Sequence, residues 1–128
     1  MKILGIGVDI VENKRIRNLI NNKSFINRTF GKKEVNFAKK TSNKVNFYAK
    51  RFAAKEAFAK SLGTGFRDNL NFKDIEILND KIGKPFYFKS KKIDKIINKK
   101  FKTKNFDLFL SISDEKDYSI AFTILQKK

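Results

Sequence analysis

The carboxylate of Glu56 interrupts the apolar face of the longest helix that the sequence predicts, which runs over residues 44–62. Phe52 precedes Glu56 by four residues and Ala59 follows it by three, and these are the spacings of a single helix face. A carboxylate on such a face is costly unless it is paired or bound to a cation. Lys60 lies one turn further on, so the two residues form either an ordinary Glu–Lys pair or part of a charged site.

A second carboxylate, Asp9, lies on the glycine-bearing face of a predicted strand over residues 3–10. Gly5 and Gly7 share this face with Asp9, because side chains alternate along a strand, and glycine leaves room for another group to approach the backbone. Asp9 could alternatively act as the N-cap of a following helix. Taken together with Glu56 and a lysine, Asp9 suits a divalent cation bound beside a phosphate group.

Two missing residue types narrow the chemistry. The 128 residues include no His and no Cys, which excludes disulfides, thiolate nucleophiles and imidazole acid–base catalysis. Any metal must therefore be held by oxygen ligands, which favours Mg²⁺, Mn²⁺ or Ca²⁺. No apolar run approaches the roughly 18 residues that cross a bilayer, and the N-terminal apolar stretch meets Asp9 rather than a cleavage site. We expect a cytoplasmic protein without membrane insertion.

The charge balance is strongly basic. Thirty Lys and Arg residues against thirteen Asp and Glu give a formal net charge of +17, which attracts nucleic acid, phosphorylated cofactors, anionic membranes or acidic proteins. The excess also fits a compositional bias toward Lys, Asn and Ile. A nucleic-acid-binding module is the main alternative function, although most of the fourteen Phe residues lie in apolar periodic segments, where core packing is expected.

The length and the periodicity predict one α+β domain over residues 1–128. After the first strand, Ile16, Leu19 and Ile20 have helical spacing, and a loop containing Asn27 and Gly31 follows. The remaining predicted elements are a short helix over 33–40, the long helix over 44–62, strands over 72–79 and 85–89, a helix ending before Phe101, and a hairpin of strands 108–113 and 119–125.

Several segments together resemble one known family. The N-terminal GIGVDIVE over residues 5–12 and the central RFAAKEAFAKSLGTG over residues 51–65 are similar to the two signatures of holo-acyl-carrier-protein synthases. Weaker matches follow in the same order, at residues 74–77, 83–85 and 110–113. The resemblance implies the 4'-phosphopantetheinyl transferase fold, in which a small, mostly antiparallel sheet packs against a long helix and shorter helices.

The resemblance also implies an activity: Mg²⁺-dependent transfer of 4'-phosphopantetheine from coenzyme A to a serine of acyl carrier protein, for fatty acid biosynthesis. Asp9 and Glu56 would hold the Mg²⁺, with Mn²⁺ as the alternative ion, and Lys60 would contact the coenzyme A phosphates. The other implied cofactor-binding residues are Arg51, Gly63, Thr64, Gly65, Gly83 and Pro85. The attacking serine must also lose its proton, and the acceptor is either metal-bound water or a carboxylate that acts through water.

The implied partners are coenzyme A, an acidic acyl carrier protein and further copies of this chain, with no role for nucleic acid. Family members are homotrimers with active sites at the subunit interfaces, and the helix after the metal aspartate is their carrier-protein dock. That helix carries Lys14, Arg15, Arg17 and Leu19 here, which provide three basic residues and one apolar anchor. Trimers and an acidic carrier are both expectations from the resemblance.

One position departs from the family pattern. The family commonly has a histidine after its Ser-x-Ser motif, at the cofactor site, whereas this chain has Asp114 there. An aspartate repels phosphate unless a cation intervenes, so either the role is dispensable or a neighbour such as Lys116 fulfils it. A catalytically inactive scaffold with the same fold is the further alternative that this position leaves open.

Overall fold

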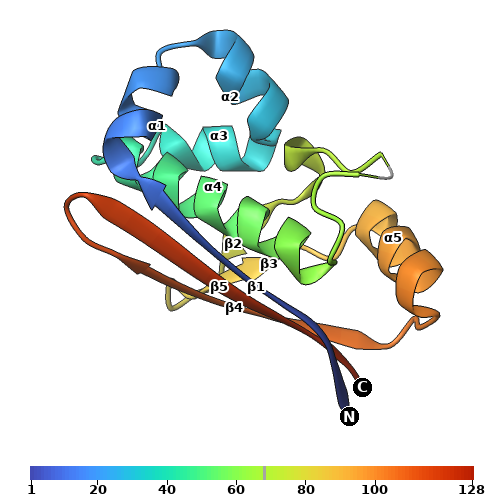
Figure 1. The fold of residues 1–128 in the computed structure, drawn as a ribbon. Coiled ribbons are helices and arrows are strands. Elements are labelled where there is room, and N and C mark those ends of the chain that lie inside the picture. The colour runs from blue at the N-terminus through green and yellow to red at the C-terminus, as the bar shows by residue number, and fades with distance from the viewer. Residues whose placement is uncertain (68) are drawn as a thin grey trace.

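The computed structural model describes residues 1–67 and 69–128 as one α+β arrangement, in which a long central helix lies on a three-stranded antiparallel sheet (Figure 1). The elements, in chain order, are β1 (Lys2–Glu12), α1 (Asn13–Leu19), α2 (Lys23–Thr29), α3 (Lys32–Ala38), α4 (Lys44–Ser61), the 3₁₀ helix η1 (Phe72–Asp74), β2 (Ile77–Asn79), β3 (Pro85–Tyr87), α5 (Lys91–Phe101), β4 (Phe106–Asp114) and β5 (Tyr118–Lys127).

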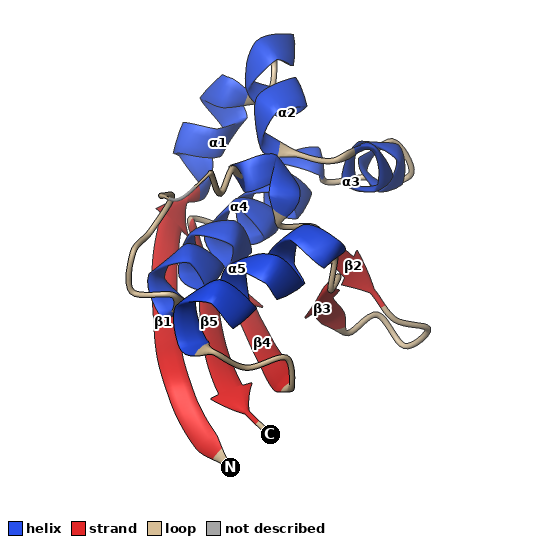
Figure 2. Cartoon of the chain, turned by 90° about the vertical axis from the view of Figure 1, so that its right-hand side faces the viewer, coloured by secondary structure: helices blue, strands red, loops and turns tan. Residues whose placement is uncertain are grey.

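The main sheet has the strand order β1-β5-β4, with both pairs antiparallel, and β2 pairs with β3 in a separate two-stranded sheet. Helices α1, α2 and α3 gather on the side of α4 that faces away from the main sheet, and α5 lies near the C-terminal end of α4 (Figure 1). Figure 2 shows β1 and the β2–β3 hairpin on opposite sides of the molecule. Residues of β1 and residues of the β2–β3 hairpin are therefore far apart within one chain.

The glycines of β1 allow α4 to lie directly on the sheet. A Cβ atom added to Gly7 would lie 1.8 Å from the Ala57 carbonyl oxygen, and one added to Gly5 would lie 1.8 Å from the Ser61 carbonyl oxygen. No side chain fits at either position, because contacts this short are forbidden. The glycine-bearing face that the sequence predicts therefore does receive another group, and that group is the backbone of α4.

Most of α4 is buried, and its alanines and phenylalanines form the centre of the core. Small residues such as Ala53, Ala54 and Ala57 are fully buried against the sheet, whereas Phe52 and Phe58 pack among other aromatic rings. The predicted end of the helix is confirmed, because Gly63 follows in the left-handed region at φ 80° and donates its N–H to the Lys60 carbonyl. Six phenylalanines lie in the core, so they are not available for stacking nucleic-acid bases: Phe25, Phe30, Phe47, Phe52, Phe58 and Phe106.

Two predicted elements are wrong. The segment around Asn27, predicted as a loop, is helix α2, which begins after Asn22, whose side chain accepts from the Ser24 and Phe25 N–H groups. The predicted strand over 72–79 is a strand only at Ile77–Asn79, preceded by η1. The carbonyls of Phe72 and Ile75 accept from a buried lysine, and carbonyls bonded in this way are not free to pair with another strand.

Candidate functional site

Asp9 and Glu56 lie near each other because β1 and α4 pack together. Burial raises the pKa of the Glu56 carboxyl above its ordinary value, and the negative charge of Asp9 raises it further, while Lys60 and Arg15 oppose the shift. The two carboxylates thus repel each other across the contact between strand and helix. Lys60 donates to Asp9 Oδ1 at 3.1 Å and to the Val8 carbonyl at 3.1 Å.

The predicted pairing of Lys60 changes in the structure. The ion pair that Lys60 forms is with Asp9, although Glu56 precedes it by one helical turn. The Asp9 side chain is largely buried, with 14% exposure, whereas that of Lys60 is 53% exposed and can move onto a bound phosphate. Asp9 follows the close-packed glycines of β1, so its backbone position is fixed by the sheet.

These carboxylates are suited to a divalent cation. Among the described residues, no group of three or more Asp, Glu, His or Cys gathers at one point, so the protein offers two ligands rather than a full shell. Magnesium is commonly held by one or two carboxylates, with water and substrate phosphate as its other ligands. Burial is the largest cause of the raised pKa of Glu56 and the charge of Asp9 adds to it, so a cation bound between the two carboxylates would favour their ionised forms. The residues therefore fit Mg²⁺.

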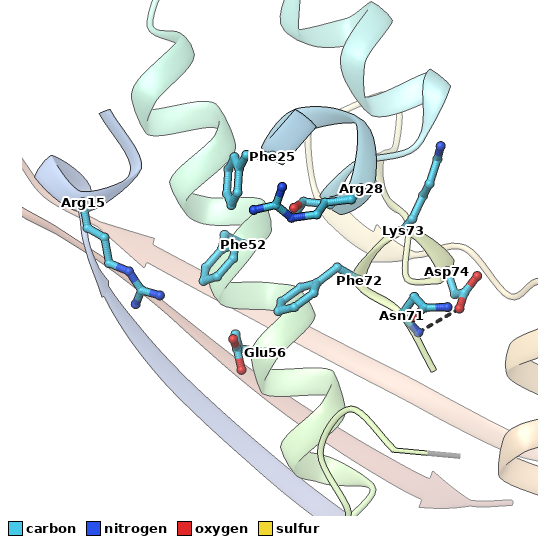
Figure 3. Close-up of a pocket in the computed structure, with 10 residues that line it drawn as sticks. Arg15, Phe25, Arg28, Phe52, Glu56, Asn71, Phe72, Lys73 and Asp74 are labelled. Carbon is cyan, nitrogen blue, oxygen red and sulfur yellow. Dashed lines mark hydrogen bonds between the residues drawn. The ribbon is translucent and has the colours of Figure 1, made fainter. Parts of the chain in front are cut away.

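A cavity of about 630 Å³ opens beside Glu56 (Figure 3). Its apolar floor is an aromatic group in which the Phe52 and Phe72 rings stack at 5.3 Å and the Phe25 ring lies 6.1 Å from that of Phe52. Its other lining residues are three cationic, two uncharged polar and one acidic: Arg15, Arg28, Lys73, Thr29, Asn71 and Asp74. The cavity therefore combines an apolar floor with a largely cationic rim and has two carboxylates in its lining, those of Glu56 and Asp74.

Arg15 belongs to this cavity as well as to α1. Its guanidinium lies 5.6 Å from the centre of the Phe52 ring, and its charge opposes the raised pKa of Glu56. Lys14 and Arg17 are exposed elsewhere on the helix, and Arg17 lines a separate pocket beside the β4–β5 turn. Leu19 is half-buried and packs against the protein's own core. Lys14, Arg15 and Leu19 nevertheless line one common pocket along α1, so the structure brings three of the four predicted docking residues together and places Arg17 apart from them.

A second group of predicted residues lies apart from the first. Arg51 donates to the Asn79 side chain on β2, Asn79 donates to the Gly83 carbonyl at 2.8 Å, and Pro85 pairs with Asn79 across the hairpin. Because β3 packs against β4, this group lies beside the β4 edge of the main sheet, whereas Asp9 lies on the β1 edge. Within one chain, Arg51, Gly83 and Pro85 therefore do not join the carboxylates.

The buried Arg51 guanidinium forms no ion pair with a described carboxylate. Its side chain is only 4% exposed, its Nε has no hydrogen-bond partner among the described residues, and no carboxylate among them lies within ion-pair distance. Its Cζ lies 3.8 Å from the centre of the Phe47 ring. Burial lowers the pKa of Arg51 to about 10, partly offset by the charge of Glu34. An unpaired buried cation of this kind is suited to an anionic ligand.

The remaining predicted residues have separate positions. Thr64 lines a pocket of about 180 Å³ between the end of α4 and α5, together with Ile96 and Lys99. Gly63 and Gly65 border open space, because an added Cβ would meet no atom within 4 Å. Asp114 ends β4, and its carboxylate accepts from Asn46 of α4. The Lys116 carbonyl accepts from the Asn13 side chain at 3.0 Å.

One feature near the site has no counterpart in the sequence-based prediction. Lys55, next to Glu56, is fully buried and pairs with Glu34 of α3 at 2.7 Å. The sequence does contain a local signal for Glu34, which is the third helical residue after Gly31 and accepts its N–H at 3.1 Å as half of a capping arrangement. Nothing in the spacing indicates that Lys55 is its partner.

Comparison with known proteins gives a consistent result over the whole chain. The family profile of the 4'-phosphopantetheinyl transferase superfamily matches residues 5–123. A holo-[acyl-carrier-protein] synthase of Pelagibacter ubique is 62% identical over the full length of both chains. One of Fusobacterium nucleatum is 41% identical, covering 96% of this chain and 98% of the relative.

Solved structures agree with the sequence relatives. A holo-(acyl-carrier-protein) synthase of Bacillus anthracis, in complex with CoA (3',5'-ADP), superposes with a TM-score of 0.83 at 35% identity and covers 100% of both chains. The synthase of Neisseria meningitidis superposes with a TM-score of 0.88 at 39% identity, covering 98% of this chain and 99% of the other.

In the part of the chain that the structure describes, no helix is long and apolar enough to span a membrane.

Proposed function

This chain belongs to the 4'-phosphopantetheinyl transferase superfamily, among the holo-[acyl-carrier-protein] synthases, and from that premise we propose that it transfers 4'-phosphopantetheine from coenzyme A to a serine of apo-acyl carrier protein. We propose further that the reaction needs Mg²⁺ and serves fatty acid biosynthesis in the cytoplasm. The observation that carries the proposal is the meeting of Asp9, Glu56 and Lys60 beside a cavity with a cationic rim.

The chemistry is a phosphoryl transfer. The serine oxygen forms a bond to the β-phosphorus of coenzyme A, the bond to the bridging oxygen breaks, and adenosine 3',5'-bisphosphate leaves. Mg²⁺ held by Asp9 and Glu56 would neutralise charge on the diphosphate oxygens. Lys60, largely exposed beside Asp9, neutralises phosphate charge that remains. Because the chain has no His, the serine proton passes to water or, through water, to a carboxylate.

The cavity beside Glu56 suits the pantetheine arm. The arm is a chain of methylene, methyl and amide groups, and the aromatic floor of Phe25, Phe52 and Phe72 offers apolar contact along it. The cationic rim, with Arg15 and Arg28, suits the diphosphate at one end of the arm. The cavity volume of about 630 Å³ lies in the range of small-molecule sites.

A trimer with shared sites accounts for the second group of residues. In a cyclic assembly each interface joins two different surfaces, so the β1 edge of one copy can meet the β4 edge of the next. Arg51, whose side chain donates to Asn79 of the hairpin, and the Gly83–Pro85 turn would then face the carboxylates of a neighbour and hold the nucleotide phosphates. The separation of the two groups within one chain supports this arrangement.

The proposed reaction is tested by mass spectrometry of apo-acyl carrier protein incubated with this protein, coenzyme A and Mg²⁺. We expect the mass of the carrier to rise by one phosphopantetheine group, and a chelator to abolish the change. Replacing the acceptor serine of the carrier by alanine is the matched control, since the adduct then has no attachment point. A wild-type carrier whose mass stays constant under these conditions would contradict the proposal.

A further inference from the structure

The buried ion pair of Lys55 and Glu34 has no direct part in the proposed chemistry. Both side chains have 0% exposure, and Lys55 is the residue immediately before Glu56 on α4. A buried ion pair is a weak source of stability, because the desolvation of two charges offsets most of their attraction. Its presence beside a binding cavity therefore suggests a role in fixing a particular geometry.

The hydrogen bonds of the pair join three segments that are distant in sequence. Lys55 Nζ donates to Glu34 at 2.7 Å, to the Phe72 carbonyl at 3.0 Å and to the Ile75 carbonyl, which uses all three ammonium protons. The Glu34 carboxylate also accepts from the Gly31 N–H at 3.1 Å and from the Ile77 N–H at 3.3 Å. Every hydrogen bond of Lys55 beyond that to Glu34 thus goes to the backbone of the segment before β2.

That backbone segment forms one wall of the cavity beside Glu56. Asn71, Phe72, Lys73 and Asp74 line the cavity, and Figure 3 shows them on the side opposite Arg15. The wall has little regular structure of its own, because η1 is a single 3₁₀ turn. Its other side-chain contacts include the Phe72 ring, which stacks on Phe52 and Phe66, and the Lys92–Asp74 pair at 2.6 Å. That pair is partly exposed, and exposed pairs of this type constrain little.

We propose that Lys55 and Glu34 are positioning residues that fix the wall over residues 71–75 against α4 and thereby set the affinity of the cavity for the pantetheine arm of coenzyme A. This inference rests on the proposed function for the identity of the ligand. The Phe72 ring stacks on Phe52 at 5.3 Å and on Phe66 at 3.9 Å, so it completes the aromatic floor of the cavity only while the wall stays close to α4. The pair itself touches neither the ligand nor the metal carboxylates.

The test compares Lys55→Met with Tyr87→Phe. Methionine keeps the length of the buried lysine but cannot donate to the wall. Tyr87→Phe is the matched control, because it also removes buried hydrogen bonds to a strand and to α4, from Tyr87 to Thr123 and to the Ala54 carbonyl, but does not touch the cavity. Coenzyme A binding is followed by calorimetry, transfer by steady-state kinetics, and stability by thermal unfolding.

We expect Lys55→Met to raise both the Kd and the KM for coenzyme A about tenfold and to keep kcat within about threefold, since a loosened wall weakens ground-state binding. Tyr87→Phe should lower the melting temperature and leave Kd and KM unchanged. A Lys55→Met protein that loses stability but keeps its Kd for coenzyme A would overturn the inference, since the pair would then serve stability alone.

Two further observations keep the inference separate from the proposed function and from folding failure. If wild-type protein transfers the phosphopantetheine group, the proposed function stands whatever Lys55→Met shows. If no transfer is seen but Lys55→Met still changes the Kd for coenzyme A, the inference about the wall stands and the proposed function does not. If Lys55→Met does not fold, hydrogen exchange of the wild type decides. The Asp74 and Ile75 amides, which donate to Asn71 and Phe72, should then exchange only on global unfolding, and fast local exchange would overturn the inference.

Discussion

At the scale of single residues, Asp9 and Glu56 illustrate how a site departs from the rules that build the fold. Both are carboxylates at positions where an apolar or small side chain would pack more favourably, and burial together with the charge of Asp9 raises the pKa of Glu56. In the proposed site, a bound Mg²⁺ would add to the positive charge that Lys60 and Arg15 already place beside the carboxylates. The close approach of the two carboxylates is therefore unfavourable in the metal-free chain, and the same approach would allow both to bind one cation.

The first prediction concerns these two carboxylates. Asp9→Ala or Glu56→Ala should reduce turnover by about 100-fold or more, because each removes a ligand of the ion that stabilises charge in the transition state. Glu56→Ala should not lower the melting temperature of the metal-free protein, since burial of the ionised carboxylate is unfavourable. Asp107→Ala is the control, because Asp107 forms a surface pair with Lys128 at 3.5 Å. Near-normal magnesium-dependent turnover in both site variants would refute the assignment.

Single residues also show where prediction from the sequence ends. Glu56 was identifiable because an acidic residue on an apolar helix face breaks a periodic pattern. Lys55 was not, because a lysine in a charged, lysine-rich helix is ordinarily exposed, and its burial depends on Glu34 and on two backbone carbonyls from a distant segment. That Arg51 Nε has no hydrogen-bond partner among residues 1–67 and 69–128 is likewise a property of the packed chain, since it depends on what surrounds the guanidinium.

At the scale of elements, the strongly periodic segments were predictable and the short ones were not. The predicted helix over residues 44–62 closely matches α4, and the predicted closing hairpin matches β4 and β5. Each of these segments is long enough for its apolar periodicity to distinguish a helix from a strand. The prediction of a strand over 72–79 was wrong for residues 72–76, because Lys55 donates hydrogen bonds to the Phe72 and Ile75 carbonyls, which a strand would use for pairing. Helix α2 was missed although Asn22 is a favourable N-cap, since its seven residues are too few for a clear period.

The second prediction separates the functions of α1. Lys14→Glu combined with Arg17→Glu should raise the KM for an acidic carrier protein about tenfold, while the KM for coenzyme A stays constant, because exposed charges act mainly on protein encounter. Arg15→Glu should raise the KM for both substrates, because Arg15 also lines the cavity beside Glu56. Steady-state kinetics with each substrate varied in turn distinguishes these outcomes. Unchanged carrier constants in all variants would mean that the basic charge of α1 is compositional bias.

At the scale of the whole molecule, the outer face of the main sheet is apolar and uncovered in the single chain. Side chains of β1 that alternate with its glycines point away from α4, and their partners on β5 and β4 share that face. The exposed members are Ile6, Val8, Ile10, Phe109, Ile120 and Phe122, each between 39% and 59% exposed. A continuous apolar sheet face of this kind marks a protein interface.

The last prediction follows from this face. Light scattering of the wild type should give about three times the 14.9 kDa chain mass. Val8 and Phe122 lie opposite each other on β1 and β5, so Val8→Asp combined with Phe122→Asp places two carboxylates side by side on the sheet. Burying them against a neighbour would leave charges unpaired, which is strongly unfavourable. The double variant should therefore be monomeric, yet still folded, because both side chains already face solvent in the single chain.

If the active site is shared between copies, the monomeric variant should also lose transferase activity, even though Asp9, Glu56 and Lys60 are unchanged. Arg51 and the Gly83–Pro85 turn lie on the far side of each chain, and only a neighbour can bring such a group to the carboxylates. Lys95→Glu, at an exposed position on α5 away from both the main sheet and the β2–β3 turn, is the control and should keep the wild-type mass. A folded monomer with full activity would show that one chain suffices for catalysis.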